Sequence, residues 1–336
     1  MGFALCGIIS PVKPSFYENY LGWVKSGLGE GLDYLLKPSS IEARSNPKNI
    51  LPECRSIIIV AYPYAFNNAS EQDFRVASYA RGRDYHHVIK EKLNQMIGFI
   101  QNEVGKTFAF KICCDTSALM EKDLAYQAGF GWIGKNGLLI NPTWGSGLLL
   151  GEILLDIELM DESFHIEDKC NDCQTCIQAC PSQCITPHRI IQANRCNSFQ
   201  SIEYKGEITL EQRNALRNWV FGCDICQIVC PFNLQPVNAC EAQTSDYPDF
   251  FRSVESGDWL LKGLFSSLFE REFNDSAMRR IRKAGLIRNC IVVIGTQKLI
   301  KYLPFLKKIN ESPEHTQTQK LTEWAMNQIQ QSESTK

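Results

Sequence analysis

Eight of the fifteen cysteines in this chain fall into two groups whose spacing is typical of bacterial ferredoxins. One group has the pattern C-x2-C-x2-C-x3-C-P from residue 170. The other has C-x2-C-x3-C-P from residue 223, with one more cysteine upstream. In ferredoxins the first three thiolates of a run bind one 4Fe-4S cluster and the fourth reaches the other cluster. The spacing therefore predicts two clusters, the first bound by Cys170, Cys173, Cys176 and Cys230 and the second by Cys180, Cys196, Cys223 and Cys226.

A zinc site is the alternative for clustered thiols, because two C-x2-C pairs can bind one zinc ion tetrahedrally. Zinc does not explain three cysteines in one run, the proline after each final cysteine, or a total of eight thiols. We therefore favour clusters. The other cysteines are expected to be packing residues, since free cysteine beside apolar neighbours is usually buried. They are Cys184 and Cys240 near the runs, and Cys6, Cys54, Cys113, Cys114 and Cys290 elsewhere.

Composition and charge exclude several other classes of protein. The chain has 336 residues, 44% hydrophobic and 21% charged, as expected for globular domains with an apolar core. No apolar stretch approaches the length of a membrane span, and the N-terminus lacks the basic start and cleavage site of a signal peptide. We therefore expect a cytoplasmic protein with reduced thiols rather than a secreted, disulfide-built one. With a net charge of −2, any nucleic-acid site must be a local patch.

The N-terminal half alternates predicted strands and helices, which indicates an α/β domain over residues 1–162. Strands are predicted at 3–9, 57–62, 108–113, 138–140 and 148–157. Helices are predicted at 84–102 and 116–128, where apolar residues recur every three to four positions. Asp84 and Asp115 stand where the N-caps of these helices are expected.

The rest of the chain changes character twice. Residues 163–240 contain both cysteine runs and little periodicity, as expected of a ferredoxin-like module in which clusters replace much of the apolar core. Residues 241–336 are predicted to be helical and basic, with nine basic and no acidic residues between Ser276 and Asn310. Such a segment either contacts phosphates or forms a solvated helix face.

Three further motifs accompany the cysteine runs. They are G-R-D-Y-H at 82–86, A-G-F-G-W-I-G-K-N at 128–136 and A-G-L-I-R-N at 284–289. Together, and in this order, the motifs resemble those of the epoxyqueuosine reductases, cobalamin-dependent iron–sulfur enzymes of queuosine biosynthesis. The resemblance extends from Gly2 to about Lys308.

The resemblance implies an α+β fold in three parts. These are an N-terminal nitroreductase-like α/β domain that binds cobalamin, a ferredoxin-like module with two clusters, and a C-terminal HEAT-like helical segment. Cobalamin would bind base-off between the first two parts. The implied substrate is tRNA of the Asp, Asn, His and Tyr type, with a GUN anticodon and epoxyqueuosine at wobble position 34.

The implied reaction is the last step of queuosine biosynthesis and takes two electrons and two protons. The clusters would reduce the cobalt to a nucleophile that attacks the epoxide. The resemblance also implies an external electron donor, a monomeric state and no contact with membranes.

The same resemblance assigns residues to roles. Asp115 matches the family's proton donor, and it follows a predicted strand, where α/β folds often place their chemistry. Its alternative role is to cap the next helix. The implied cobalamin contacts are Arg44, Ala77, Lys135, Asn136, Leu139, Ser146, Leu150 and Ser198. The implied tRNA contacts are Lys205, Arg279, Arg280, Arg282, Lys283 and Arg288.

Several of these assignments have plainer alternatives. Arg44 is otherwise a solvated loop charge, and Lys135 and Asn136 stand in a turn-like sequence. Some relatives carry a cysteine near the cobalt just before the G-x-D-Y-H run, whereas this chain has Ala77 in that stretch. His86 is predicted to cap or pack rather than to bind cobalt.

Three other functions compete with this interpretation. A reductive dehalogenase shares cobalamin and two clusters, but usually has an export signal and a tyrosine as proton donor, and neither is evident here. A ferredoxin-type electron carrier would not retain cobalamin on purification. A tRNA-binding scaffold with structural clusters would not lose an activity when Asp115 alone is changed.

Overall fold

The structure is a computed structural model that describes residues 1–66, 72–160, 164–234, 254–258, 269 and 273–333. These residues form two compact units. The first contains residues 1–66, 84–160, 164–194 and 225–234, and the second contains 72–83, 195–224 and those described from 254 onward. The predicted domain boundaries near 162 and 240, and Cys240, lie outside the described residues, so the three-domain division remains a prediction. None of the described helices is long and apolar enough to cross a membrane.

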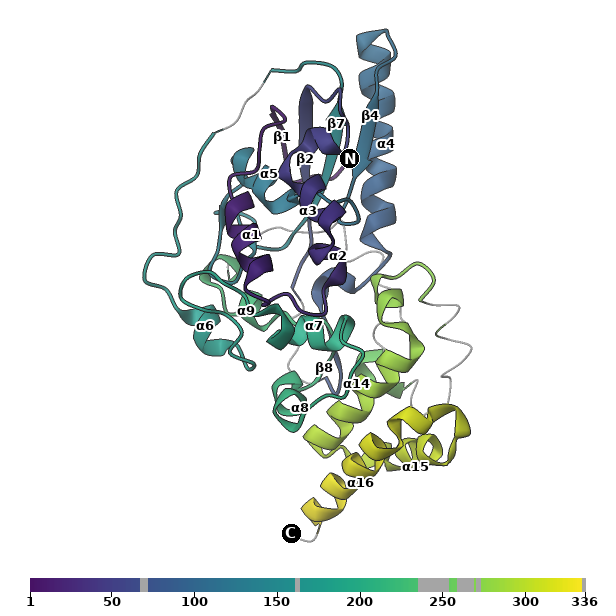
Figure 1. Ribbon diagram of the computed structural model, residues 1–336. Coiled ribbons are helices and arrows are strands. Elements are labelled where there is room, and N and C mark those ends of the chain that lie inside the picture. The colour runs from purple at the N-terminus through teal and green to yellow at the C-terminus, as the bar shows by residue number, and fades with distance from the viewer. Residues whose placement is uncertain (67–71, 161–163, 235–253, 259–268, 270–272, 334–336) are drawn as a thin grey trace. The chain divides into compact units, whose positions relative to one another are not determined.

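A four-stranded sheet organises the first unit (Figure 1). Its strands are β1 (Leu5–Ile9), β2 (Ser56–Pro63), β4 (Phe110–Cys113) and β7 (Leu148–Leu155). They follow the order β1-β2-β7-β4, and every neighbouring pair is antiparallel. Each strand overlaps a range predicted from the sequence. All eight residues of β2 are buried, because helices cover both faces of the sheet.

The helix α4 (Tyr85–Val104) covers one of these faces (Figure 1). Its buried apolar side chains recur every four residues, at Ile89, Leu93 and Ile97. Gly151 of β7 permits this close packing, since a Cβ atom there would come within 2.7 Å of the first of these side chains. Asp84 accepts a hydrogen bond from the backbone N–H of His86, so the predicted N-cap of this helix is confirmed.

The helix α5 (Glu121–Gln127) packs on the opposite face and begins five residues later than predicted. Its N-cap is Met120. Asp115 lies in the preceding connection with φ +56°, in the left-handed region that favours glycine. A hydrogen bond from Thr116 N to Cys114 O turns the chain at this point, before the helix can start. The alternative role of Asp115 as the N-cap of this helix is therefore wrong.

The remaining elements of the first unit are short. They are α1 (Tyr17–Lys25), α2 (Asp33–Leu36), α3 (Pro38–Ser45), α6 (Thr175–Ala179), α9 (Ile225–Ile228), the 3-10 helices η1 (Pro47–Asn49) and η4 (Pro231–Asn233), and the strands β5 (Trp132–Ile133) and β6 (Leu139–Ile140). β5 and β6 pair as a hairpin, and β6 confirms the strand predicted at 138–140. α6 and α9 each carry a cysteine of one run, and they pack against each other.

Helices build most of the second unit (Figure 1). They are α7 (Asn197–Ile202), α8 (Leu210–Leu216), α14 (Arg282–Gln297), α15 (Leu303–Glu311), α16 (Gln319–Glu333), and the 3-10 helices η2 (Ser78–Ala80), η5 (Ala277–Ile281), η6 (Ile300–Tyr302) and η7 (Pro313–Thr318). A further 3-10 helix, η3 (Ala193–Arg195), precedes α7. Strands β3 (Arg75–Val76) and β8 (Trp219–Phe221) form a parallel pair. The helical character predicted for the C-terminal segment is confirmed.

Two polar residues of α14 anchor the segments that carry Cys196 and Cys223. Asn289 is fully buried, and its amide donates to one carbonyl of α7, at 2.8 Å, and to one of β8, at 2.7 Å. Arg288 donates to two more carbonyls at α7 and just after it. α7 follows the first of these cysteines directly, and β8 ends two residues before the second. Buried amides of this kind hold a local arrangement because losing a partner costs about 1–3 kcal/mol.

The isolated cysteines largely follow the prediction that they pack. Cys184 is buried. Of the five cysteines that the sequence places beside apolar neighbours, four are also buried, namely Cys54, Cys113, Cys114 and Cys290. Cys6 is the exception, and the prediction that it is buried is wrong. It belongs to β1, an edge strand in which only the last residue is buried.

Candidate active site and cluster loops

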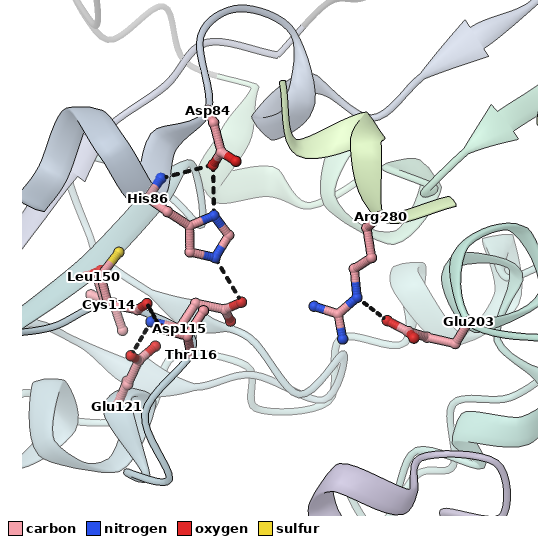
Figure 2. Close-up of polar contacts among 9 residues, drawn as sticks. All are labelled: Asp84, His86, Cys114, Asp115, Thr116, Glu121, Leu150, Glu203 and Arg280. Carbon is pink, nitrogen blue, oxygen red and sulfur yellow. Dashed lines mark hydrogen bonds and ion pairs between the residues drawn. The ribbon is translucent and has the colours of Figure 1, made fainter. Parts of the chain in front are cut away.

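A chain of three polar side chains lies at the start of α4, and Figure 2 shows it as Asp84, His86 and Asp115. His86 Nδ1 is 2.6 Å from Asp84 Oδ1, and its Nε2 is 3.1 Å from Asp115 Oδ2. Burial lowers the pKa of His86, but the hydrogen bonds to Asp115 and Asp84 outweigh it and raise the pKa to about 9. The imidazole is therefore protonated at neutral pH and donates from both nitrogens. The side chain of Asp115 is 45% exposed, so a substrate can reach it.

The contact between His86 and Asp115 is not predicted by the sequence, in which they stand 29 positions apart. His86 does stack on Tyr85, with ring centroids 4.0 Å apart, in keeping with the packing role predicted for it. Its second nitrogen nevertheless faces the predicted proton donor. The available signal is the proximity of Asp84 and His86 in the G-R-D-Y-H motif, because a carboxylate beside a histidine often orients its ring.

Two glutamates behind Asp115 are also missed by sequence reasoning. Glu121 accepts a hydrogen bond from the backbone N–H of Asp115 (Figure 2). The carboxyl of Glu152 in β7 is close enough to Glu121 for their charges to interact, and it is 0% exposed. Neither carboxyl oxygen of Glu152 has a hydrogen-bond partner among the described residues. A proton shared by the pair avoids a second buried charge without a partner.

The surroundings of both glutamates favour their neutral forms. Burial raises the pKa of Glu121 to about 8, and the charge of Asp115 acts in the same direction. Burial and the charge of Glu121 raise the pKa of Glu152 well above its ordinary value. The pair therefore retains a proton at neutral pH, and the folded chain binds more protons here than the unfolded chain does.

Replacing Glu152 by glutamine is expected to flatten the pH dependence of stability. Because these carboxyls have a raised pKa in the folded state, the free energy of unfolding falls as the pH rises from their ordinary pKa of 4.5 towards about 8. One such proton gives a slope of about 1.4 kcal/mol per pH unit. Urea midpoints of the anaerobic protein between about pH 5 and 8 should fall less steeply in Glu152→Gln than in the wild type. The exposed Glu158→Gln serves as control, and equal slopes in all three proteins would contradict the shared proton.

Two of the residues predicted to contact cobalamin, Lys135 and Ser146, form hydrogen bonds with the cysteine-bearing loops, and their contact with cobalamin remains a prediction. Lys135 Nζ donates to the carbonyls of Asn171, at 2.7 Å, and Cys173, at 2.9 Å. Ser146 Oγ donates to Gln227 Oε1 at 3.0 Å and accepts from Asn233 Nδ2 at 2.9 Å. Gln227 lies within the second cysteine run, and Asn233 follows its last cysteine by three residues. The polar groups of these two side chains therefore have protein partners.

The other predicted cobalamin contacts have different surroundings. Asn136 is 8% exposed, and its Nδ2 has no acceptor among the described residues. Leu139 belongs to the apolar core that β2 and α5 form, and Leu150 packs against this core. Arg44 donates to a carbonyl of its own helix at 3.1 Å and lies over the ring of Tyr20. In the second unit, Ala77 is buried and Ser198 is half-buried.

The four thiols predicted to bind the first cluster all belong to the first unit. Burial raises the pKa of the Cys176 thiol, and the neighbouring thiols of Cys170, Cys230 and Cys173 raise it further. The four sulfurs are therefore close enough for their charges to interact. Cys230 comes from a different run than its three partners, as the ferredoxin rule requires.

The thiols predicted to bind the second cluster are divided between the two units. Cys180 and Cys226 belong to the first unit, whereas Cys196 and Cys223 belong to the second. Cys180 Sγ lies 3.5 Å from the thiol of Cys184, the off-pattern cysteine that the sequence marks only as a packing residue. The ligand set of this cluster remains a prediction.

Most of the predicted tRNA contacts are at the surface of the second unit. Lys205, Arg279, Arg280 and Arg282 are exposed, and Lys283 is half-buried. Arg280 forms an ion pair with Glu203 at 2.5 Å (Figure 2). Arg288 differs, because its guanidinium donates to carbonyls inside the unit and burial lowers its pKa to about 10.

Two family descriptions match parts of the chain. Residues 44–116 match "Epoxyqueuosine reductase QueG, DUF1730", and residues 169–233 match a "4Fe-4S double cluster binding domain". The curated epoxyqueuosine reductase of Cellulophaga algicola is 32% identical over 294 residues, which cover 86% of this chain and 93% of that protein. The epoxyqueuosine reductase of Vibrio cholerae is 34% identical over 307 residues, covering 88% and 80%.

Solved structures agree with these matches. Epoxyqueuosine reductase from Streptococcus thermophilus is 29% identical, with a TM-score of 0.81 over 98% of this chain and 87% of that one. An epoxyqueuosine reductase solved with an epoxyqueuosine-modified tRNA-Tyr stem loop is 27% identical, with a TM-score of 0.84 and the same coverage. These matches confirm the predicted fold class and the presence of 4Fe-4S clusters. This chain therefore belongs to the epoxyqueuosine reductase family.

Proposed function

We propose that this oxidoreductase reduces epoxyqueuosine to queuosine at the wobble position of tRNA, with cobalamin and two 4Fe-4S clusters as cofactors. The observation that carries the proposal is the exposed carboxyl of Asp115, held against a protonated His86 in a chain that also has the double-cluster motif. An electron carrier needs clusters but no proton donor. A Bacillus subtilis epoxyqueuosine reductase, 25% identical with a TM-score of 0.82, has a catalytic aspartate loop that swings out of its active site. We propose that the connection carrying Asp115 is the catalytic loop of this chain.

The side chain of Asn136, which the sequence predicts to contact cobalamin, offers a hydrogen-bond donor that a corrin could use. The buried Nδ2 of Asn136 has no protein acceptor among the described residues, and the amide groups around a corrin ring offer carbonyl oxygens for such a donor. Asn136, Leu139 and Leu150, all residues of the first unit, would contribute to holding the corrin. When bound and reduced, cobalamin supplies the nucleophile for the epoxide carbon.

The protein's part in the reaction is to deliver protons. Converting the epoxide into an alkene removes its oxygen as water, which takes two electrons and two protons. As a C–O bond breaks, the oxygen gains negative charge and takes up a proton through Asp115. The Asp115 carboxylate receives that proton from His86 Nε2, 3.1 Å from its Oδ2, and the second proton comes from solvent, to which the side chain of Asp115 is 45% exposed. Asp84, hydrogen-bonded to Nδ1, stabilises the imidazolium before the transfer and orients its ring.

A basic surface of the second unit is the proposed tRNA contact, consisting of Lys205, Arg279, Arg280, Arg282 and Lys283. Phosphate contacts are positional and weaken as salt increases. Arg288 is not included, because its hydrogen bonds hold α7 in place. We also propose that the substrates are tRNAs of the Asp, Asn, His and Tyr type, that an external donor supplies the electrons, and that the chain acts as a cytoplasmic monomer.

Replacing Arg279 and Arg282 together by glutamine is expected to weaken binding of the tRNA anticodon stem loop. The loss should be similar for epoxyqueuosine-modified and unmodified stem loops, since phosphates are bound rather than the modified base. The slope of log affinity against log salt should decrease by about one for each phosphate that the variant no longer neutralises. Lys308→Gln, an exposed basic residue of α15, serves as the matched control. An unchanged slope in the double variant would contradict the proposed surface.

The proposed function is tested by anaerobic reconstitution. The chain is supplied with iron, sulfide and a strong reductant, with or without cobalamin, and incubated with epoxyqueuosine-bearing tRNA. Mass analysis of the nucleosides should show queuosine only when cobalamin is present. If no queuosine forms in either case, the proposed reaction is wrong. If it forms equally without cobalamin, the proposed cofactor is wrong and the reaction stands.

A further inference from the structure

We propose that Trp132 raises the reduction potential of the first cluster by donating its indole N–H to the ligand sulfur of Cys170. The proposal rests on the ligand set predicted for this cluster, and it does not depend on cobalamin or tRNA. It gives the A-G-F-G-W-I-G-K-N motif a role in electron transfer, whereas the sequence predicts only corrin contacts within it.

The hydrogen bond from the indole to the sulfur joins a fully buried donor to a half-buried acceptor. Trp132 Nε1 lies 3.3 Å from Cys170 Sγ, and the tryptophan is 1% exposed. An indole N–H can only donate, so the sulfur is the acceptor. The ring also packs edge-on against Phe232, with centroids 4.8 Å apart, two residues after Cys230. Trp132 therefore contacts the segments around Cys170 and Cys230. In chain order, these cysteines are the first and the last of the four predicted ligands of the first cluster.

The β5–β6 hairpin fixes the position of this ring. Trp132 pairs with Ile140 across the hairpin. Gly131, at φ +155°, permits the close approach, since a Cβ atom there would come within 2.0 Å of the carbonyl oxygen of Ile140. Asn141 Nδ2 donates to the carbonyl of Phe130 at 2.7 Å and ties the two ends of the hairpin together. The contacts within the hairpin therefore fix the position of the indole.

The same hairpin forms a second contact with the loop that carries Cys170 and Cys173. Lys135 lies in the turn between β5 and β6, and its ammonium donates to the carbonyls of Asn171 and Cys173, at 2.7 and 2.9 Å. Its ammonium brings a positive charge to the loop between two of the cluster's ligands. A positive charge and an N–H donor act in the same direction, because both stabilise the more negative, reduced cluster.

Hydrogen bonds to the sulfurs are among the main determinants of cluster potential. Loss of the indole donor should therefore make the first cluster harder to reduce. The potential of the second cluster should not change, because its predicted ligands do not include Cys170.

Trp132→Phe keeps an aromatic ring beside Phe232 and removes only the donor. Redox titration of the anaerobic full-length protein, followed by EPR, should show one cluster midpoint falling and the other unchanged. The reduced cluster is the stronger acceptor, so loss of the donor should lower the ratio of reduced to oxidised cluster at a given potential by up to about tenfold, the full worth of one hydrogen bond to a charged group. For a one-electron couple this corresponds to about 59 mV. Trp23→Phe is the matched control, because the Trp23 indole donates to a backbone carbonyl at 2.8 Å and not to a sulfur.

Unchanged midpoints in Trp132→Phe, with the full iron content, would overturn the proposal. If this variant fails to hold the cluster, pulsed EPR of the reduced protein labelled with indole-15N tryptophan gives the answer. A 15N coupling that persists in Trp23→Phe supports the hydrogen bond, and its absence in the unsubstituted protein rules the bond out. These measurements need no tRNA and no cobalamin, so their failure leaves the nucleoside assay of the proposed function unaffected, and the converse also holds.

Discussion

Asp115→Asn is expected to slow epoxide reduction by roughly 100- to 10,000-fold, the usual contribution of a general acid, while both clusters remain in place. The asparagine can keep the left-handed backbone and the hydrogen bond from its N–H to Glu121. It cannot release a proton to the epoxide oxygen. The rate of queuosine formation is measured under single-turnover conditions, with iron content determined in parallel. Asp33→Asn, an exposed aspartate of α2, should react as fast as the wild type.

The pH profile separates a lost proton donor from a damaged site. The pKa of His86 is about 9, so the wild-type rate should fall above that pH as the imidazolium loses the proton it passes to Asp115. This decline should be absent in His86→Gln, which should be slow at every pH. A near-normal rate in Asp115→Asn, or the same alkaline decline in His86→Gln, would contradict the proposed relay.

Cys230→Ala should remove one cluster and abolish activity. This thiol is the only ligand that the second run is predicted to give to the first cluster, so we expect that cluster to be lost without it. Iron content should fall from about eight to about four atoms per chain, since the second cluster keeps all four of its predicted ligands. Queuosine formation should fall below detection, because the electron path has lost one of its two clusters.

Cys6→Ala is the matched control for this experiment, since Cys6 is an exposed thiol outside both runs. It should keep the iron content and the rate of the wild type. Iron retained in full by Cys230→Ala would show that another thiol completes the first cluster, and the predicted crossover of ligands would be wrong.

The sequence predicts the parts of this protein that depend on local patterns. The strands of the central sheet and the helix α4 follow from apolar periodicity, and the N-cap Asp84 follows from its position before that helix. The cysteine runs are equally local, since their spacing alone indicates 4Fe-4S clusters, which the family match confirms. In each case the information lies within a few neighbouring residues.

Contacts between distant segments are not accessible in this way. Asp115 has the sequence of an N-cap, but its hydrogen bonds to His86 and Glu121 hold it in a separate connection before α5. Glu152 follows an apolar strand pattern, so nothing local indicates that it meets a second carboxyl. Lys135 lies in a turn whose partners are 36 and 38 positions away. Tertiary contacts decide what these residues do, and one sequence does not contain them.

The role of Arg288 illustrates the same limit for charged residues. In the sequence it is one of nine basic residues in an uninterrupted segment, and all members look equally available to phosphate. In the structure its guanidinium donates to backbone carbonyls around α7, and the exposed arginines lie elsewhere in the segment. The position of each arginine on its helix, rather than its charge, decides whether its side chain bonds to backbone carbonyls inside the unit, as Arg288 does, or lies at the surface.

A single-turnover reaction of the pre-reduced protein tests the central claim most directly. The cobalamin-loaded protein is reduced, freed of reductant and mixed anaerobically with excess epoxyqueuosine-bearing stem loop, while EPR follows the clusters and mass analysis follows the nucleoside. The two clusters together store the two electrons that one epoxide needs, in addition to those held by the reduced cobalamin, so at least about one equivalent of queuosine should form as the reduced-cluster signals disappear. Persistence of those signals during queuosine formation, or their loss with epoxyqueuosine left intact, would contradict the claim that the clusters drive the reduction.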